Sequence, residues 1–259
     1  MAIYITGDTH GTLDVAKLAK LNKIITEGDY LIVLGDFGIC WDDGASDERV
    51  RSFWNRQKCH VLFIDGNHEN FNLLNAYHVS EWHGGKVHSL GKKITHLMRG
   101  QVFELEGKTF FTMGGAASHD CGTGLDMFIG RNLEQYHTLD WHEIYAIRRR
   151  EWNLDCRVPG RSWWAEEVPS PTEFAEAEAN LAAHGNGVDY VLTHTGSSRI
   201  YAHLGYSATE KPWNAGLIEF FDKVEETVDF KHWWFGHMHK DFVYDERHRG
   251  FYNDVVMVD

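Results

Sequence analysis

Residues 3–11 read IYITGDTHG, and this stretch sets out the pattern on which the chain is built. A short apolar run ends at a glycine, and side chains that can bind a metal ion follow at once. Short apolar runs bounded by glycine are typical of buried strands. The same pattern recurs along the chain, with apolar runs at residues 2–6, 30–34, 60–64, 189–193 and 233–235. Because these strands alternate with helical segments, the sequence predicts an α/β fold with a mostly parallel sheet.

The helix with the clearest end signals is predicted at residues 170–184. Ser170 suits the N-cap, Pro171 suits the first helical position, Glu173 completes a capping box, and Gly185 ends the helix. Further helices are predicted at residues 47–57, 70–77 and 214–226. Two hairpins are predicted as well, one from residues 102–105 and 109–113, the other from residues 242–244 and 251–257.

The composition excludes several classes of protein. Of the 259 residues, 43% are hydrophobic and 24% are charged, so the chain can bury a large core. No apolar run approaches the roughly 18 residues that a membrane span needs, and no secretory signal precedes residue 3, so we expect a cytoplasmic protein. Cys40, Cys59, Cys121 and Cys156 have no C-x-x-C spacing, which favours reduced thiols over disulfides or structural zinc. The formal charge of −13 disfavours a nonspecific binder of duplex DNA.

A single domain is predicted over residues 1–259, with an insertion at residues 115–169 where the strand and helix alternation stops. This segment is rich in arginine and aromatic residues. Its arginines could contact a phosphate or could form a solvated charged surface: Arg131, Arg148, Arg149, Arg150, Arg157 and Arg161. Trp163 and Trp164 could stack on a base or sugar, or could pack the insertion against the core.

Metal-ligand residue types follow every one of the five apolar runs. Asp8 and His10 are two residues apart, so an extended backbone points both side chains the same way, and His237 and His239 repeat this spacing. The carboxyl ends of parallel strands meet at one edge of a sheet, where ligands bind. That edge collects seven candidate ligands, which are Asp8, His10, Asp36, Asn67, His194, His237 and His239. Seven ligands exceed the needs of one ion, and without a thiolate they suit Mn, Fe or Zn.

Taken in order, these motifs resemble the signature of the calcineurin-like metallophosphoesterase superfamily, which is D-x-H, G-D, G-N-H-[DE], a single His, and G-H-x-H. The matching positions here are Asp8-Thr9-His10, Gly35-Asp36, Gly66-Asn67-His68-Glu69, His194 and Gly236-His237-Met238-His239. The resemblance implies two stacked mixed β-sheets flanked by helices, a four-layer αββα sandwich. It also implies a phosphoesterase with two metal ions, Mn above Fe or Zn, and a small phosphoester as substrate.

The resemblance further assigns roles to the residues. It implies one ion held by Asp8, His10, Asp36 and His239, and another held by Asp36, Asn67, His194 and His237, with Asp36 as the bridge. Two such ions produce hydroxide near neutral pH, which would attack the phosphorus of a mono- or diester. His68, which is not a ligand in this scheme, would protonate the leaving alkoxide.

One departure narrows the expected substrates. The protein serine/threonine phosphatase branch continues its second motif as G-D-x-x-D-R-G, whereas this chain has Ile39 and Cys40 at the Asp and Arg positions. Protein phosphatase activity of that type is therefore not expected. Two alternatives stay open, a metal-binding scaffold or regulatory protein without turnover, and a nuclease or nucleotide phosphodiesterase.

Overall fold

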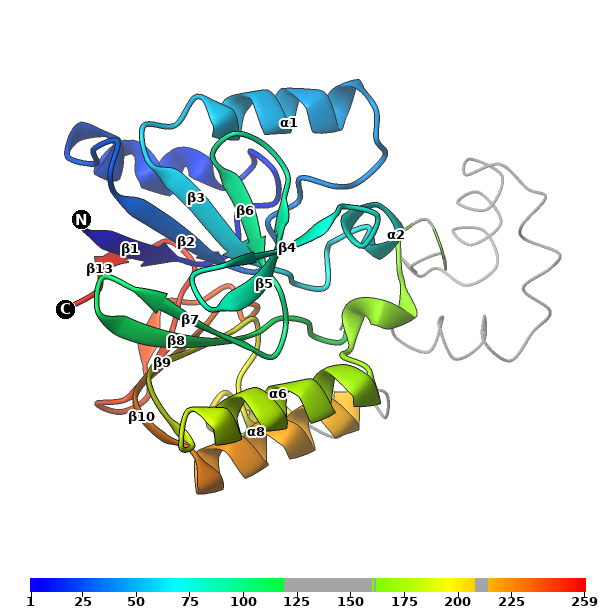
Figure 1. Cartoon of the computed structure of the whole chain (residues 1–259), viewed down its shortest axis with the longest axis vertical. Coiled ribbons are helices and arrows are strands. Elements are labelled where there is room, and N and C mark those ends of the chain that lie inside the picture. The colour runs from blue at the N-terminus through cyan, green and yellow to red at the C-terminus, as the bar shows by residue number, and fades with distance from the viewer. Residues whose placement is uncertain (119–159, 161, 208–213) are drawn as a thin grey trace, which may run out of the picture.

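The computed structural model of the protein describes residues 1–118, 160, 162–207 and 214–259. Over these residues the chain forms two stacked mixed β-sheets with helices on both outer faces (Figure 1). The expected four-layer αββα architecture is therefore confirmed. Most of the predicted insertion at residues 115–169 lies outside the described residues, as do Cys121, Cys156 and the arginines at positions 131, 148–150, 157 and 161.

The first sheet has the strand order β13-β1-β2-β3-β6-β5-β4 in the described part of the chain. Strands β1, β2, β3 and β6 run parallel to one another, while β13 pairs with β1, β5 with β6 and β4 with β5 in the antiparallel sense. The bounds are β1 Ile3–Thr6, β2 Tyr30–Leu34, β3 His60–Ile64, β4 Val79–Trp82, β5 Gly85–Ser89, β6 Ile94–Leu97 and β13 Val255–Met257. The first three strands agree with the predicted apolar runs, and β4, β5 and β6 were not predicted.

The second sheet has the order β11-β12-β10-β9-β8-β7. Its strands are β7 Gln101–Leu105, β8 Lys108–Met113, β9 Gly187–Thr193, β10 Asp229–Phe235, β11 Phe242–Val243 and β12 His248–Gly250. Strands β8, β9, β10 and β12 are parallel, and β7 pairs with β8 as the predicted hairpin.

The second predicted hairpin is wrong. Strand β11 pairs with β12, and not with residues 251–257. After Gly250 the chain crosses to the other sheet, where β13 pairs with β1 in the register Ile5 to Val256. An edge strand offers unpaired N–H and C=O groups to any strand the tertiary fold brings near, so local spacing does not decide this partner.

The described helices are α1 Ala45–Asn55, α2 Phe71–Leu74, α6 Pro171–Ala183, α7 Ser198–His203 and α8 Ala215–Thr227, and short 3₁₀ turns include η1 Val15–Ala19, η2 Leu21–Lys23 and η4 Ala165–Glu167. Helix α1 covers the first sheet, and α6 and α8 cover the second (Figure 1). The predicted capping box at α6 is present. The Glu173 amide donates to the Ser170 hydroxyl over 3.3 Å, and the Ser170 amide donates to the Glu173 carboxylate over 2.7 Å.

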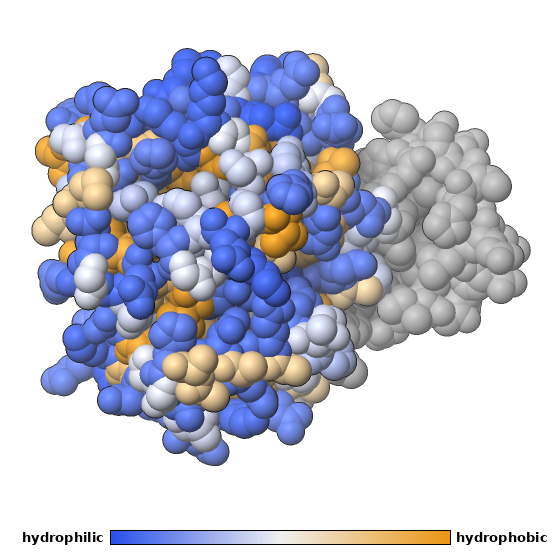
Figure 2. Space-filling view, viewed as in Figure 1, coloured by the Kyte–Doolittle hydropathy of each residue, from blue (hydrophilic) through white to orange (hydrophobic). Residues whose placement is uncertain are grey.

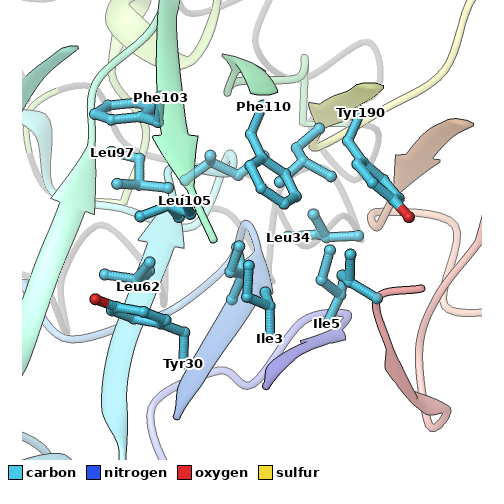
Figure 3. Close-up of a cluster of buried hydrophobic side chains, with 14 of the residues drawn as sticks. Ile3, Ile5, Tyr30, Leu34, Leu62, Leu97, Phe103, Leu105, Phe110 and Tyr190 are labelled. Carbon is cyan, nitrogen blue, oxygen red and sulfur yellow. The ribbon is translucent and has the colours of Figure 1, made fainter. Parts of the chain in front are cut away.

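Three buried layers hold the sandwich together. Between the sheets, Ile3 and Ile5 face Phe110 and Tyr190 (Figure 3). The other two layers lie between each sheet and its helices. Strand β2 is buried along its whole length, which explains why it reads as an unbroken apolar run.

The outer surface is mostly polar on the face seen in Figure 2, with hydrophobic residues between the polar ones. Cys40 and Cys59 are buried free thiols, as expected for reduced core cysteines. No helix within the described residues has the length and apolar character needed to cross a membrane.

We expect the substitution Ser170→Ala to lower the free energy of unfolding by about 1 kcal/mol, because it leaves an N-terminal amide of α6 without its cap. Urea denaturation of the whole chain measures the change. Ser80→Ala, at an exposed position of β4, is the matched control. Equal stability of the two variants would contradict the capping role.

Candidate metal centre

The five motifs converge because of the sheet topology. Strands β1, β2 and β3 are parallel neighbours in the first sheet, and β9 and β10 are parallel neighbours in the second. Each motif begins where its strand ends, so all five lie at one edge of the sandwich. The first sheet supplies Asp8, His10, Asp36 and Asn67, and the second sheet supplies His194, His237 and His239.

One half of the centre consists of Asp8, His10, Asp36 and His239. These four residues each offer a ligand atom, and the four atoms all lie within 4.8 Å of one another. His10 Nε2 is 3.4 Å from Asp36 Oδ2, and His239 Nε2 is 3.1 Å from Asp8 Oδ2. Two carboxylates therefore face two imidazole nitrogens across a space of the size that one metal ion needs.

The other half consists of Asp36, Asn67, His194 and His237. His194 Nε2 is 3.3 Å from Asp36 Oδ1 and 3.2 Å from Asn67 Oδ1. The His194 and His237 rings are 5.0 Å apart. The Leu34 carbonyl, 2.7 Å from His194 Nδ1, accepts a hydrogen bond from it and leaves Nε2 directed at the other ligand atoms. The Asn67 amide donates to Ser118 Oγ over 3.2 Å, so its carbonyl oxygen faces His194.

Asp36 belongs to both halves. Its Oδ2 faces His10, while its Oδ1 faces His194 and accepts the His68 backbone amide over 2.8 Å. Asp36 is 1% exposed. One buried carboxylate thus turns one oxygen toward each half of the centre.

The donor set fits divalent cations. Asp8 is completely buried, and its Oδ2, although 3.1 Å from His239 Nε2, accepts no hydrogen bond from the described residues. A buried carboxylate oxygen without a hydrogen bond is costly unless a cation compensates it. Carboxylates, an amide oxygen and imidazoles are ligands that suit Mn, Fe or Zn.

Two glycines allow the loops to approach this closely. A side chain at Gly35, where φ is +90°, would overlap the His194 ring, and a side chain at Gly66 would overlap the Asp36 carboxylate. Both positions therefore require glycine, which explains the Gly-Asp and Gly-Asn steps of the motifs.

Four of the predicted ligands have strained backbones. The φ angles are +42° at His10, +46° at Asp36, +65° at His237 and +48° at His239. Residues other than glycine pay about 1–3 kcal/mol for such strain, which concentrates at functional sites. Hydrogen bonds between the loops offset the cost of this strain. One of them joins the His10 amide to the Asp36 carbonyl over 2.8 Å.

His68 lies at the side of the centre rather than within either ligand group. Its Nε2 is 3.9 Å from Asp36 Oδ2, and its ring centroid is 5.4 Å from that of His10. The side chain is 26% exposed, whereas that of Asp36 is 1% exposed. His68 can therefore reach a molecule that enters from solvent.

The carboxylates raise the pKa values of the histidines in the metal-free protein. Burial disfavours the charged form of His10, but the hydrogen bond and charge of Asp36, the hydrogen bond of Asp14 and the charge of Asp8 outweigh it and raise the pKa to about 9. The pKa of His194 also rises to about 9, since the charge and hydrogen bond of Asp36 outweigh complete burial. Protons thus occupy positions that metal ions can take.

Glu69 connects the loop after β3, in which it lies, to the loop after β2. Its Oε1 accepts the amides of Phe37 at 2.7 Å and Gly38 at 3.2 Å. Burial, reinforced by the charge of Asp36, raises its pKa to about 8. No role was predicted for Glu69 from the sequence, and its contacts show that it fixes the turn carrying Asp36.

Three other neighbours of the centre were missed as well. Asp14 contacts His10, Ser118 contacts Asn67, and Tyr252 stacks on His239. The spacing of Asp14, four residues after His10, was the one available signal. Nothing near Ser118 or Tyr252 in the sequence marks them.

The positions that depart from the phosphatase motif are part of the core. Ile39 and Cys40 are 0% and 1% exposed, so neither side chain can contact a phosphate from solvent. Trp164 is buried in the core layer between the first sheet and its helices, and it contacts Trp41 edge to face. For Trp164 the packing alternative is therefore the correct one.

The fold and the site define an α/β sandwich with a centre of carboxylates and histidines at the strand ends. A family model described as calcineurin-like phosphoesterase matches residues 1–241, and the chain belongs to that family. A comparison with curated proteins gave no match.

Two solved structures are among those that match this chain in a structural comparison. One is a Staphylococcus aureus protein described as a 5′-nucleotidase, with a TM-score of 0.47 and 11% identity, covering 97% of this chain. This chain spans 48% of that protein's length. The other is a phosphopantetheinyl hydrolase from Mycobacterium tuberculosis, with a TM-score of 0.36 and 14% identity, covering 97% of this chain and 90% of the other.

We expect the affinity for Mn²⁺ to rise between pH 6 and pH 9, because the ion displaces protons from His10 and His194, whose pKa values are about 9. Calorimetric titrations in buffers of different ionisation enthalpy measure the protons released. The stability of the metal-free protein should change in the opposite direction with pH. Protonation of His10 and His194 stabilises the fold fully below pH 6.5, and this stabilisation is lost as the pH rises through 9. A pH-independent affinity would contradict this assignment.

Proposed function

We propose that this protein is a dinuclear metal-dependent phosphoesterase that hydrolyses phosphate mono- or diesters of small molecules. Asp8, His10, Asp36 and His239 hold one ion in this proposal. Asp36, Asn67, His194 and His237 hold the other. Membership of the calcineurin-like phosphoesterase family supports the reaction class.

The observation that carries the proposal is the position of Asp36. Its two carboxylate oxygens face different histidines, 3.4 Å from His10 Nε2 and 3.3 Å from His194 Nε2. A carboxylate that binds a single ion would need the other ligands of that ion near only one of its two oxygens. A ligand group on each side of Asp36 is the arrangement that a bridge between two ions requires.

Bound ions, with Mn²⁺ as the expected metal, would lower the pKa of a water nucleophile and neutralise charge on the phosphoryl group. The chain's own residues orient the reaction. His68 donates a proton from Nε2 to the oxygen of the leaving group, since it is accessible from solvent and lies beside the shared carboxylate. Asn67 presents a neutral oxygen, which limits the negative charge facing an anionic substrate.

The charge of the whole chain supports a small substrate. With a formal charge of −13, the protein as a whole repels polyanions such as duplex DNA. Two divalent ions beside Asp8 and Asp36 would reverse the charge locally. A small phosphoester would contact only this locally positive site, whereas a duplex would also contact other parts of a protein with a net negative charge.

Removing the shared carboxylate charge tests the centre. We expect the wild-type protein to bind two Mn²⁺ ions per chain and to hydrolyse an activated aryl phosphate. Asp36→Asn should lose tight binding of both ions and reduce kcat/KM by at least 100-fold. Elemental analysis and steady-state kinetics measure the two effects. Two bound ions without turnover on a broad phosphoester panel would support the scaffold alternative instead.

The role of His68 is tested separately from metal binding. His68→Ala should reduce kcat by about 10²- to 10⁴-fold while both ions remain bound, because a general acid contributes that much and His68 is outside the ligand groups. The effect should be smaller for a substrate with a good leaving group. His78→Ala, at an exposed position, is the matched control. Unchanged kcat in His68→Ala would exclude this role.

A further inference from the structure

Tyr252 lies in the loop between β12 and β13, where the chain crosses from the second sheet to the first. This loop follows the part of the chain that the family model matches, which ends at residue 241. The Tyr252 ring stacks on the His239 ring, with centroids 4.8 Å apart and planes 16° from parallel. A residue outside the matched part therefore contacts a candidate ligand directly.

The Tyr252 hydroxyl connects this contact to a second histidine. It donates to Asp14 Oδ1 over 3.2 Å, and the other oxygen of Asp14 is 2.7 Å from His10 Nδ1. Since an ionised carboxylate only accepts hydrogen bonds, His10 Nδ1 carries the proton and Nε2 remains available as a ligand atom. Asp14 and Tyr252 thus contact His10 and His239, the two histidines of one half of the centre.

The position of Tyr252 is fixed by further contacts with Lys17, in the turn η1 after β1, and with Asp241, in the loop after β10. Lys17 Nζ donates to the carbonyls of Gly7, Asp8 and Tyr252, at 3.1 Å for Gly7 and 2.5 Å for Tyr252. Asp241 accepts three successive backbone amides of the loop, beginning with that of Tyr252 at 2.7 Å. The loop is therefore anchored to the same strand end that carries Asp8.

The other half of the centre contains His194 and His237, and the orientation of His194 has a different origin. There a backbone carbonyl, that of Leu34, orients His194. Carboxylates that orient a ligating histidine raise its basicity and its affinity for metal. His10 and His194 are thus oriented by chemically different groups, a carboxylate and a backbone carbonyl.

We propose that Asp14 and Tyr252 are positioning residues that set the metal affinity of the His10 and His239 half of the centre. This inference rests on the proposed dinuclear function. Asp14 fixes the tautomer of His10, and Tyr252 holds the plane of the His239 ring and the orientation of Asp14 at the same time. The loop that joins the two sheets thereby tunes one metal site and not the other.

The experiment is a titration of metal-free protein with Mn²⁺, following free ion by electron paramagnetic resonance, for wild type and for Tyr252→Phe, Tyr252→Leu, Asp14→Asn and Asp14→Ala. Removal of a group that orients a ligand typically weakens metal binding 10- to 100-fold. We expect about tenfold weaker binding of one ion in Tyr252→Phe and up to 100-fold in Asp14→Ala. Asp14→Asn keeps a hydrogen-bond acceptor, so its Mn²⁺ affinity should fall less than that of Asp14→Ala. The other ion should bind within twofold of wild type.

Two controls separate positioning from general stability. Tyr30→Phe, in the interior at the opposite end of β2 from Asp36, should bind both ions as the wild type does. The unfolding temperature of metal-free Tyr252→Phe should match that of metal-free Tyr30→Phe. If Tyr252→Phe binds both ions equally more weakly and also unfolds at a lower temperature, the loop has a merely structural role and the proposal is overturned.

The remaining outcomes distinguish this proposal from the proposed function. If wild type binds two ions and hydrolyses phosphoesters, but Tyr252→Phe, Tyr252→Leu and Asp14→Ala bind both ions with wild-type affinity, only the positioning role fails. If wild type binds fewer than two ions, the dinuclear function fails and the positioning role fails with it.

Discussion

The buried carboxylate of Asp36 is the constraint on which the rest of the site depends. Burial alone would raise its pKa, yet the charges of His194 and His68 and hydrogen bonds from His10 and His194 hold the pKa well below its ordinary value. An ionised group at this depth needs cations on every open side. The histidines therefore converge on it from both sheets, and Gly66 must leave it space.

Much of the centre was predictable because chain direction, rather than fine packing, decides it. A parallel strand carries the residues after its last position to one edge, so apolar runs ending in Gly-Asp or Gly-Asn predict which side chains meet. The glycines carried a second signal, since Gly35 and Gly66 are sterically required where one loop crosses another. The helix after Ser170 was predictable for a local reason, since the capping box lies within four residues of sequence.

The unpredicted parts depend on contacts between distant segments. Residues 255–257 could have continued a hairpin by spacing alone, but the open edge of β1 in the other sheet became their partner. Tyr252 came close to His239 and Asp14 only as a result of that crossing. Strands β4, β5 and β6 lack the unbroken apolar runs of the central strands, and β4 is largely exposed, so periodicity marked them weakly.

Metal binding and folding of this edge are physically linked. The strained φ angles at His10, Asp36, His237 and His239 have a cost that other contacts of the fold must offset. These contacts include hydrogen bonds between loops and between sheets, such as the His237 amide to Asp8 at 3.1 Å. Protons on His10 and His194 then balance the carboxylates in place of ions. The fold thus meets part of the cost of ordering these ligands, which adds to their affinity for an ion.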